Sequence, residues 1–189
     1  MAAKIQQLTE FSRTDLEGLC EATEEAIRDG NGFGWLAPPP RPKLESYWRG
    51  VLLVPERELY VARLDGVIVG SAQLVKPPPN NEAMAHAAQI TTFFVAPWAR
   101  GHGLAQGLLR EIEKSARRQN FKVLDLDVRA TQNAAVALYE RAGFERWGVK
   151  ENYARVNGDY VAGYFFTKDL SKPRPRRRPA RSRRAGPAR

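Results

Sequence analysis

One stretch of the chain decides the fold, Val95-Ala96-Pro97-Trp98-Ala99-Arg100-Gly101-His102-Gly103-Leu104-Ala105. It follows an apolar, β-rich segment, residues 90–95, and precedes a segment over residues 104–119 whose apolar side chains recur at helical spacing. A strand, a Gly-rich turn and a helix N-terminus form an anion cradle, because successive backbone N–H groups and the helix dipole point at one place. Gly101 and Gly103 lack a Cβ, so a phosphate can approach the backbone closely. The stretch therefore predicts a phosphorylated cofactor.

The turn also carries a family signature. Its residues 100–105 match every fixed position of the pattern Gln/Arg-x-x-Gly-x-Gly/Ala, and in this they resemble the pyrophosphate loop of the acetyl-CoA-dependent GNAT N-acetyltransferases. The resemblance implies that acetyl-CoA is held by the loop and the first helical residues, namely Arg100, Gly101, His102, Gly103, Leu104, Ala105 and Gln106. His102 occupies a variable position, so it is either a phosphate contact or a solvent-facing loop residue.

The strand before the turn has a role in the same family. The resemblance implies that the backbone of Phe93, Phe94 and Val95 pairs with the pantetheine arm of acetyl-CoA like an added strand. One backbone N–H of this segment would also bind the thioester oxygen as negative charge develops on it. The contact is made by the main chain, so the apolar side chains themselves are expected to be core residues.

A second motif lies downstream. GNAT members commonly show Asn-x-x-Ala-x-x-Leu-Tyr-x-x-x-Gly-Phe, and the later parts of this pattern stand at Ala135, Leu138-Tyr139 and Gly143-Phe144. The resemblance makes Tyr139 the general acid that protonates the CoA sulfur, and the alternative is a core aromatic residue on a short helix. The family's asparagine position holds Gln132, with Asn133 one residue later, so we expect the cofactor contact from Gln132 before Asn133.

Asp127 is the candidate general base. Some GNAT members have a glutamate at the matching position and use it, often through a water molecule, to accept the proton of the amine. In residues 124–128 the apolar and acidic residues alternate, so Asp125 and Asp127 share one face of a predicted strand. The alternative is that both are solvated or ion-paired carboxylates.

Composition describes a globular chain with a separate basic end. Of the 189 residues 43% are hydrophobic and 27% charged, with no apolar run near the roughly 20 residues that cross a bilayer. Residues 171–189 hold nine basic residues and no acid, which equals the whole net charge of +9. The rest is formally neutral. The N-terminus lacks a secretory apolar core, and Cys20 is the single cysteine, so we expect a cytoplasmic protein without an internal disulfide.

The order of predicted elements is mixed. Strands are expected over residues 4–8, 58–64, 67–76, 86–95, 123–128, 144–147 and 159–168, and helices over 14–29, 42–54, 104–119 and 132–141. Thr14 and Glu17 have the spacing of a capping box at the first helix, and residues 77–82 form a loop. Strand, helix and strand over 90–128 predict one parallel pair. The expected fold is therefore α+β (mixed α/β) and GNAT-like, with a mostly antiparallel twisted sheet flanked by helices over residues 1–170 and a disordered Arg/Pro-rich tail over 171–189.

Several further residues lie where this fold places its acceptor cleft. The aromatic candidates are Trp35, Tyr47, Trp48, Trp147 and Tyr153, which either stack on a substrate or belong to the core. Residues 30–40, with three Gly and three Pro, are the candidate lid. His86 has no second His or Cys at ligand spacing, so no metal site is expected.

Two other classes of protein compete with this interpretation. Gly101-x-Gly103 begins the fingerprint G-x-G-x-x-G/A of a dinucleotide-binding oxidoreductase. Its last position, however, holds Gln106 instead of Gly or Ala, and the turn follows several strands, whereas the fingerprint follows the first strand of its fold. The basic tail is typical of an arm that contacts nucleic-acid phosphates, and no aromatic residues interleave it to stack on bases.

The sequence thus favours an N-acetyltransferase that moves an acetyl group from acetyl-CoA to a primary amine, expected to belong to a small molecule, by direct attack in a ternary complex. A protein amine as acceptor stays open, as do a homodimer and a weak contact of the tail with polyanions. No membrane partner is expected.

Overall fold

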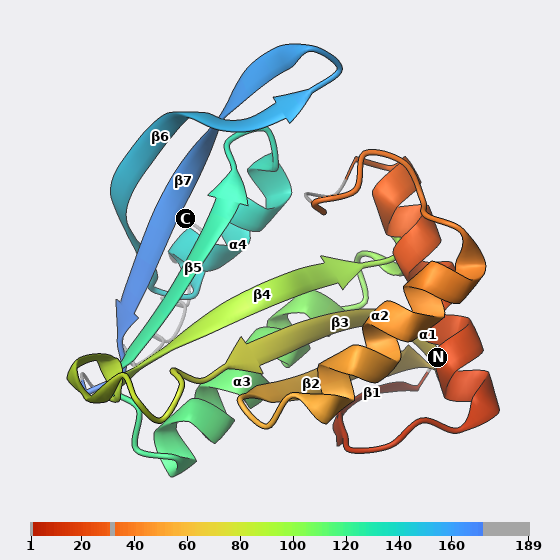
Figure 1. The fold of residues 1–189 in the computed structure, drawn as a ribbon, viewed down its shortest axis with the longest axis horizontal. Helices are drawn as coiled ribbons and strands as arrows, with labels where there is room; N and C mark the ends of the chain where they lie inside the picture. Colours follow the sequence, from red (N-terminus) through yellow and green to blue (C-terminus); the bar gives the residue numbers. More distant parts are fainter. Residues whose placement is uncertain (1, 31–32, 172–189) are drawn as a thin grey trace, which may run out of the picture.

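A seven-stranded sheet runs through the middle of the protein, in the order β1-β2-β3-β4-β5-β7-β6 (Figure 1). The computed structural model describes residues 2–30 and 33–171. β4 and β5 are parallel, and every other neighbouring pair is antiparallel. The predicted fold class with one parallel pair is therefore confirmed. The strands are β1 (Ala3–Leu8), β2 (Arg57–Leu64), β3 (Val67–Val75), β4 (Ala87–Val95), β5 (Val123–Arg129), β6 (Glu145–Val156) and β7 (Asp159–Asp169).

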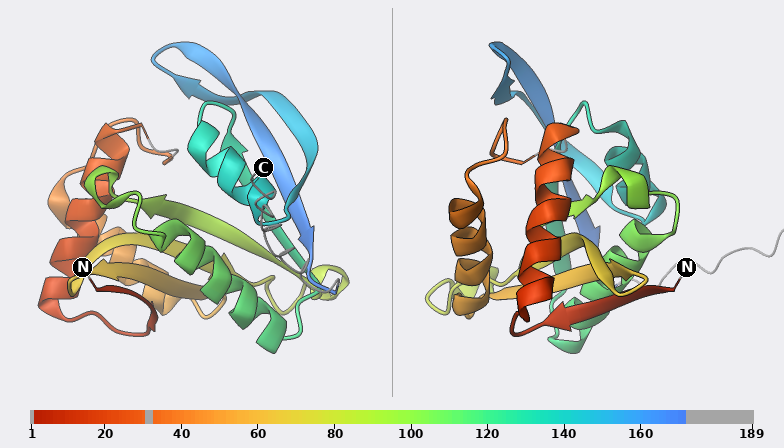
Figure 2. Two further views of the ribbon diagram at one scale, coloured as in Figure 1. Left: turned by 180° about the vertical axis from the view of Figure 1, so that it is seen from behind. Right: turned by 90° about the vertical axis from the view of Figure 1, so that its right-hand side faces the viewer.

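Helices cover both faces of the sheet (Figure 2, right). α1 (Arg13–Arg28) and α2 (Arg41–Leu53) lie on one face, and α3 (Leu104–Arg118) and α4 (Asn133–Arg141) lie on the other. Short 3-10 turns, η1 (Glu82–Met84) and η2 (Pro97–Ala99), precede β4 and α3. The apolar spacing of α3 brings Leu108, Ile112 and Ala116 onto its sheet-facing side, where all three are fully buried. Burial of this stripe fixes the N-terminus of α3 beside the end of β4.

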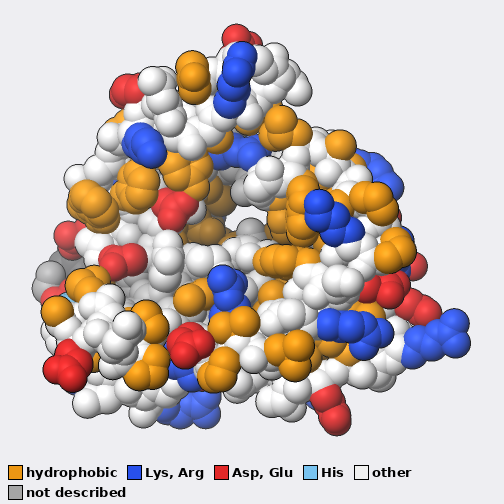
Figure 3. Space-filling model, in the orientation of Figure 1, with side chains coloured by type: hydrophobic (Ala, Val, Ile, Leu, Met, Phe, Trp, Pro, Cys, Tyr) orange, Lys and Arg blue, Asp and Glu red, His pale blue; other side chains and the backbone are white. Residues whose placement is uncertain are grey.

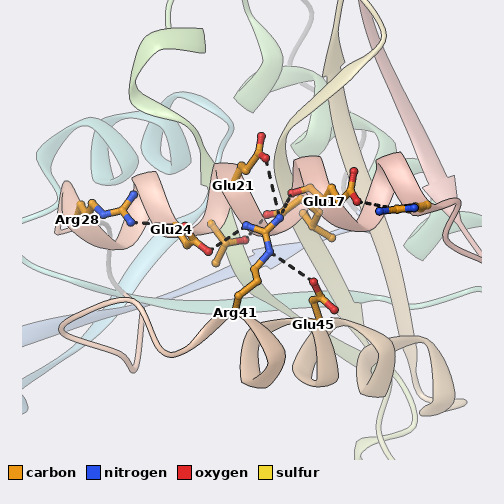
Figure 4. Close-up of polar contacts among 9 residues, drawn as sticks. Glu17, Glu21, Glu24, Arg28, Arg41 and Glu45 are labelled. Carbon is orange, nitrogen blue, oxygen red and sulfur yellow. Dashed lines mark hydrogen bonds and ion pairs between the residues drawn. The ribbon is translucent and has the colours of Figure 1, made fainter.

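Arg41 at the start of α2 ties that helix to α1 (Figure 4). Its guanidinium donates to Glu24 Oε1 at 3.0 Å and to the backbone carbonyl of Glu17 at 2.8 Å. Glu21 and Glu45 lie at 4.0 and 3.6 Å from the same group. A planar group that donates to both a carboxylate and a main-chain oxygen fixes orientation as well as distance. The contacts hold α2 against α1 and thereby set where the chain between them meets the end of β4.

β4 and β5 diverge soon after they begin. They pair over three positions alone, Ala87 with Val123, Ala88 with Leu124 and Gln89 with Asp125. Beyond this point the two strands separate, as Figure 1 shows. Residues 90–95 pair with β3 on one side, and on the other side they have no strand partner among the described residues. The backbone groups on that free edge need hydrogen-bond partners from elsewhere.

Two of the element boundaries predicted from local sequence patterns are wrong. The first helix is capped by Ser12, whose hydroxyl accepts from the Asp15 N–H at 3.1 Å, so the predicted capping box at Thr14 and Glu17 is wrong. The strand predicted over residues 144–147 is the 12-residue β6. Register shifts against β7 between Arg146 and Gly148 and between Lys150 and Ala154 break the alternation that would have marked it. The other predicted elements agree to within a residue or two, and η1 forms at the end of the predicted loop.

The sheet ends close to the predicted domain boundary. The Leu170 N–H donates to the Lys122 carbonyl at 2.7 Å, and the Leu170 side chain is buried. The predicted tail, residues 171–189, lies outside the described residues apart from Ser171. Across the described ranges no helix is long and apolar enough to span a membrane.

Candidate active site

A cavity of about 1140 Å³ fills the space between the diverging strands. Figure 3, drawn in the orientation of Figure 1, shows the cavity as a hollow in the centre of the molecule, with hydrophobic side chains around it. Residues 90–95 of β4 form one wall and residues 126–129 of β5 form another. The turn before α3 and the first turns of α4 close the end toward which both strands run. The site is thus built where the sheet lacks its own hydrogen-bond partners.

The Gly-rich turn forms one end of this cavity. Gly101 and Gly103 have φ of +85° and +73°, in the left-handed region that favours glycine, and Gly103 directly precedes the first residue of α3. A Cβ on either glycine would meet no atom within 4 Å, so the turn leaves open space above its backbone. The first N–H groups of α3 point into that space. The turn has the shape and polarity of an anion cradle.

Most of the predicted cofactor residues meet at this cavity. It is lined by Phe93, Phe94, Val95, Arg100, Gly101, Gly103, Leu104, Ala105, Gln106, Gln132 and Asn133. His102 is the exception, since its exposed ring turns back toward the carbonyl oxygens of Ala99 and Arg100, each 3.1 Å from Nδ1. The structure therefore favours the loop interpretation of His102 over a phosphate contact.

β4 carries a bulge at the centre of the cavity wall. Ser71 of β3 pairs with Phe94 and Gln73 pairs with Thr91, so both Thr92 and Phe93 lie opposite a single residue. Thr92 has φ of +49°, a conformation that costs a non-glycine residue about 1–3 kcal/mol. Hydrogen bonds at 3.2 Å hold it, from Ser71 Oγ to the Thr92 carbonyl and between Tyr47 and the Thr92 hydroxyl. A bulge turns backbone groups out of the ladder, here toward the cavity.

Tyr139 lies on the α4 side of the cavity. Its side chain is 4% exposed, and its ring packs against Phe93, Phe144 and Phe166 with centroid distances of 5.7, 5.9 and 6.0 Å. Burial, and next the negative charge of Asp127, raise the pKa of the Tyr139 phenol above its usual value. The hydroxyl is therefore protonated at neutral pH and can act as a proton donor.

Asp127 faces the opposite side. In the register of β5 with β7, Leu126 pairs with Phe166, which packs on Tyr139, while Asp127 pairs with Phe165. Phe165 packs instead on Tyr153, whose hydroxyl donates to Asp127. Gln89 Nε2 donates to the other carboxylate oxygen at 3.2 Å. Asp127 is thus a fixed carboxylate on the α2 side of the cavity, and the predicted alternation along β5 is confirmed.

Comparison with known proteins identifies the family to which this chain is similar. Residues 20–144 match the model of the Acetyltransferase (GNAT) family. The chain belongs to the GNAT acetyltransferase family. An uncharacterised N-acetyltransferase of Azospirillum brasilense is 59% identical over 128 residues, which cover 68% of this chain and 76% of that protein. The N-alpha-acetyltransferase RimI of Mycobacterium tuberculosis is 34% identical over 125 residues, or 65% and 72% of the two chains.

Solved structures share the fold. The Salmonella typhimurium acetyltransferase yncA, determined with its cofactor acetyl-CoA, superposes with a TM-score of 0.74 over 92% of this chain and 96% of its own at 16% identity. Membership of the family makes this GNAT protein an acetyl-CoA-dependent N-acetyltransferase, as the two sequence motifs predicted. Among the residues that the structure describes, no group of His, Cys, Asp and Glu is arranged to hold a metal ion.

The predicted aromatic residues of this GNAT domain separate into two groups. Trp35, Tyr47 and Tyr153 line the cavity on the α2 and β6 sides. Trp48 is fully buried in the core, and Trp147 is 67% exposed on β6. The first three therefore stay as acceptor-side candidates, and the last two do not reach the cavity.

The chain between α1 and α2, predicted as a lid, is held beside the cavity where it leaves α1. Arg100 pairs with Asp29 at 2.5 Å, and Gln132 Nε2 donates to the Gly30 carbonyl at 2.7 Å. Residues 31–32 of the predicted lid lie outside the described residues. The Gln132 amide thus contacts the α1–α2 connection while it lines the cavity.

Arg129 was missed as a site residue. It stands two residues after Asp127 on β5, lines the cavity and is 9% exposed. Its Nη2 donates to the Phe33 carbonyl at 2.5 Å. The alternation that placed Asp125 and Asp127 on one face extends to Arg129, so the sequence already contained the signal.

Proposed function

We propose that acetyl-CoA lies along the free edge of β4 with its pyrophosphate in the turn Arg100–Ala105, and that a primary amine of a small molecule enters from the α2 side. The divergence of β4 and β5 carries this proposal, because one cavity then joins the anion cradle, the bulge and Asp127. The hydroxyl of Thr91, on the same wall, is buried without a hydrogen-bond partner among the described residues. An orphaned hydroxyl and an unpaired strand edge both fit a site that a polar ligand completes.

In this proposal the cavity residues act on the reacting groups from the two faces of the sheet. Acetyl-CoA supplies a thioester, whose carbonyl carbon accepts the amine nitrogen. The N–C bond forms as the C–S bond breaks, and the amine proton passes to Asp127 directly or through a water. A backbone N–H of residues 93–95 donates to the carbonyl oxygen, and Tyr139 gives its proton to the departing sulfur. Acetyl transfer thus ends with an N-acetylated acceptor and a CoA thiol.

The walls of the acceptor half support a small amine. Trp35 and Tyr47 from the α2 side and Tyr153 from β6 face the cavity beside Asp127. Aromatic rings around a carboxylate suit a compact cationic amine. The similarity to RimI favours one second candidate, the N-terminal α-amine of a protein.

Thiol release from acetyl-CoA with a panel of amines tests the proposed function. We expect turnover with at least one small primary amine, and Asp127→Asn should lower kcat/KM by about 10²–10⁴-fold, as loss of a general base does. Asp125→Asn is the matched control, because Asp125 lies on the same strand and face but does not line the cavity. Equal rates for the two variants would contradict the role of Asp127, and turnover with N-terminal peptides alone would favour a protein acceptor.

A further inference from the structure

Arg129 is a buried cation that the described protein leaves without a carboxylate. The residue is 9% exposed, and the one hydrogen bond between its side chain and a described residue goes to the Phe33 carbonyl. Two other shielded cations have a carboxylate partner, since Arg63 pairs with Asp15 at 2.6 Å and Lys168 pairs with Glu113 at 2.5 Å. A guanidinium has more N–H donors than one carbonyl can use. Arg129 is also one of the residues that line the cavity.

A buried guanidinium without a carboxylate partner is stabilised when an anionic ligand binds to it. Removing a charged group from water is costly unless it is paired and hydrogen-bonded. Arg129 also lies near Tyr153, because the Tyr153 ring packs over Gly163, the β7 partner of Arg129. The positive charge of Arg129 opposes the rise in the Tyr153 pKa that burial causes. Tyr153 is itself bonded to Asp127, so the cation belongs to the same part of the cavity as the candidate base.

The position of Arg129 identifies which ligand would carry the anion. The cradle for the cofactor pyrophosphate lies at the N-terminus of α3, on the face of the sheet shared by α3 and α4. Arg129 shares the other face with Asp127, since they are two apart on β5, and its partner on β7 is Gly163, over which the Tyr153 ring packs. The anion therefore belongs to the acceptor rather than to the cofactor.

We propose that Arg129 binds a carboxylate of the acceptor, which makes the acceptor an amino acid or a close analogue with its amine near the carboxylate. This inference rests on the proposed function. Residues two apart on a strand are about 6.6 Å apart, so Asp127 and Arg129 present opposite charges side by side. A zwitterion is complementary to that pair, with its ammonium group toward Asp127 and its carboxylate toward the planar fork of Arg129.

Matched acceptors test the assignment. Steady-state rates at saturating acetyl-CoA are compared for free L-amino acids and for the same amino acids as carboxamides, which keep the amine and lose the anion. We expect the full-length protein to prefer the acids by about tenfold or more in kcat/KM, as a hydrogen-bonded charge provides. Arg129→Gln removes the charge and shortens the side chain, and it should abolish this preference by lowering kcat/KM for the acids more than for the amides.

Controls separate a binding role from a structural one. Arg129→Lys restores the charge and should recover part of the preference, and Arg155→Gln removes an arginine of β6 that does not line the cavity and should change nothing. Acetyl-CoA affinity, measured by calorimetry, should stay unchanged in Arg129→Gln. Equal loss of acid and amide turnover, weaker acetyl-CoA binding, or a parent without preference for the acids would each overturn the inference. Turnover with amides alone would leave the proposed function standing, whereas no thiol release with any amine would remove both.

Discussion

The contact between Gly163 and Tyr153 offers a sharp test of the acceptor side. Gly163 is buried on β7 between Arg129 of β5 and Lys150 of β6. A Cβ built on Gly163 would meet the Tyr153 ring, with Cδ1 at 2.6 Å and two further ring carbons closer still. Carbon atoms in contact lie about 3.5–4.0 Å apart. Gly163→Ala therefore forces the ring to move by about 1 Å or more.

Such a movement separates Tyr153 from Asp127. An O–H···O hydrogen bond spans about 2.5–3.0 Å, so a shift of this size breaks or badly lengthens it. Tyr153 holds Asp127 through this hydrogen bond, and a misplacement of about 1 Å in an active site costs up to 10²-fold in rate. We expect Gly163→Ala to lower kcat/KM for the amine by about 10- to 100-fold. Acetyl-CoA affinity should be retained, because the proposed cofactor site lies on the other face of the sheet.

Gly148→Ala is the matched control for this substitution. Gly148 lies on the neighbouring strand β6, and its added Cβ would sit 3.7 Å from the Phe165 Cβ, an ordinary contact. A double-mutant cycle with Tyr153→Ala completes the test, because without the ring the clash disappears and the two losses of stability should not add. Turnover by Gly163→Ala at the rate of the parent, or additive losses in thermal unfolding, would refute the reasoning.

Four further outcomes follow from the geometry. Gly103→Val should raise the acetyl-CoA Kd in calorimetry, because φ of +73° strains a branched residue whose side chain would enter the cradle; an unchanged Kd would misplace the pyrophosphate. Tyr139→Phe should lower the single-turnover rate by about 10²–10⁴-fold with acetyl-CoA affinity retained, and an unchanged rate would exclude the general acid. Burial raises the pKa of the Cys20 thiol from 9.0 to about 11, so it should resist a thiol reagent at pH 8 in the folded protein, and the free energy of unfolding should fall as pH rises between these values. A chain that ends at Ser171 should keep the melting temperature and small-amine turnover of the full chain, since the Leu170 contacts remain; a loss of several degrees would show that the tail stabilises the domain.

The features that the sequence predicted well are local ones. The cradle needs a strand, glycines that adopt positive φ and a helix start, and all of these lie within residues 90–119. The alternation along β5 likewise depends on neighbouring residues alone. Such elements form as expected because a short stretch contains every group they require.

The features that it missed depend on contacts between distant segments. Tyr153 reaches Asp127 because two irregularities in β6 and the absence of a side chain at Gly163 bring its ring over the sheet. Tyr47 and Trp48 are neighbours in the sequence, yet Trp48 is core and Tyr47 lines the cavity. Only the packing of α2 against α1, fixed in part by Arg41, decides which ring faces which way.

The alternation of side chains along β5 explains how one short strand can contribute to both proposed half-sites, one for acetyl-CoA and one for the acceptor. Leu126 belongs with the rings around Tyr139 on the α4 face, whereas Asp127 and Arg129 belong with Tyr153 on the other. Because the period of a strand is two residues, a register slip of one residue would exchange the faces and turn both charges toward the cofactor side. The antiparallel ladder with β7 over residues 123–129 prevents this slip, since β5 pairs there at every position and with β4 at three. The register of β5 is therefore set by β7. The edge of β4 stays free for a ligand, and β5, which separates the two proposed half-sites, stays ordered.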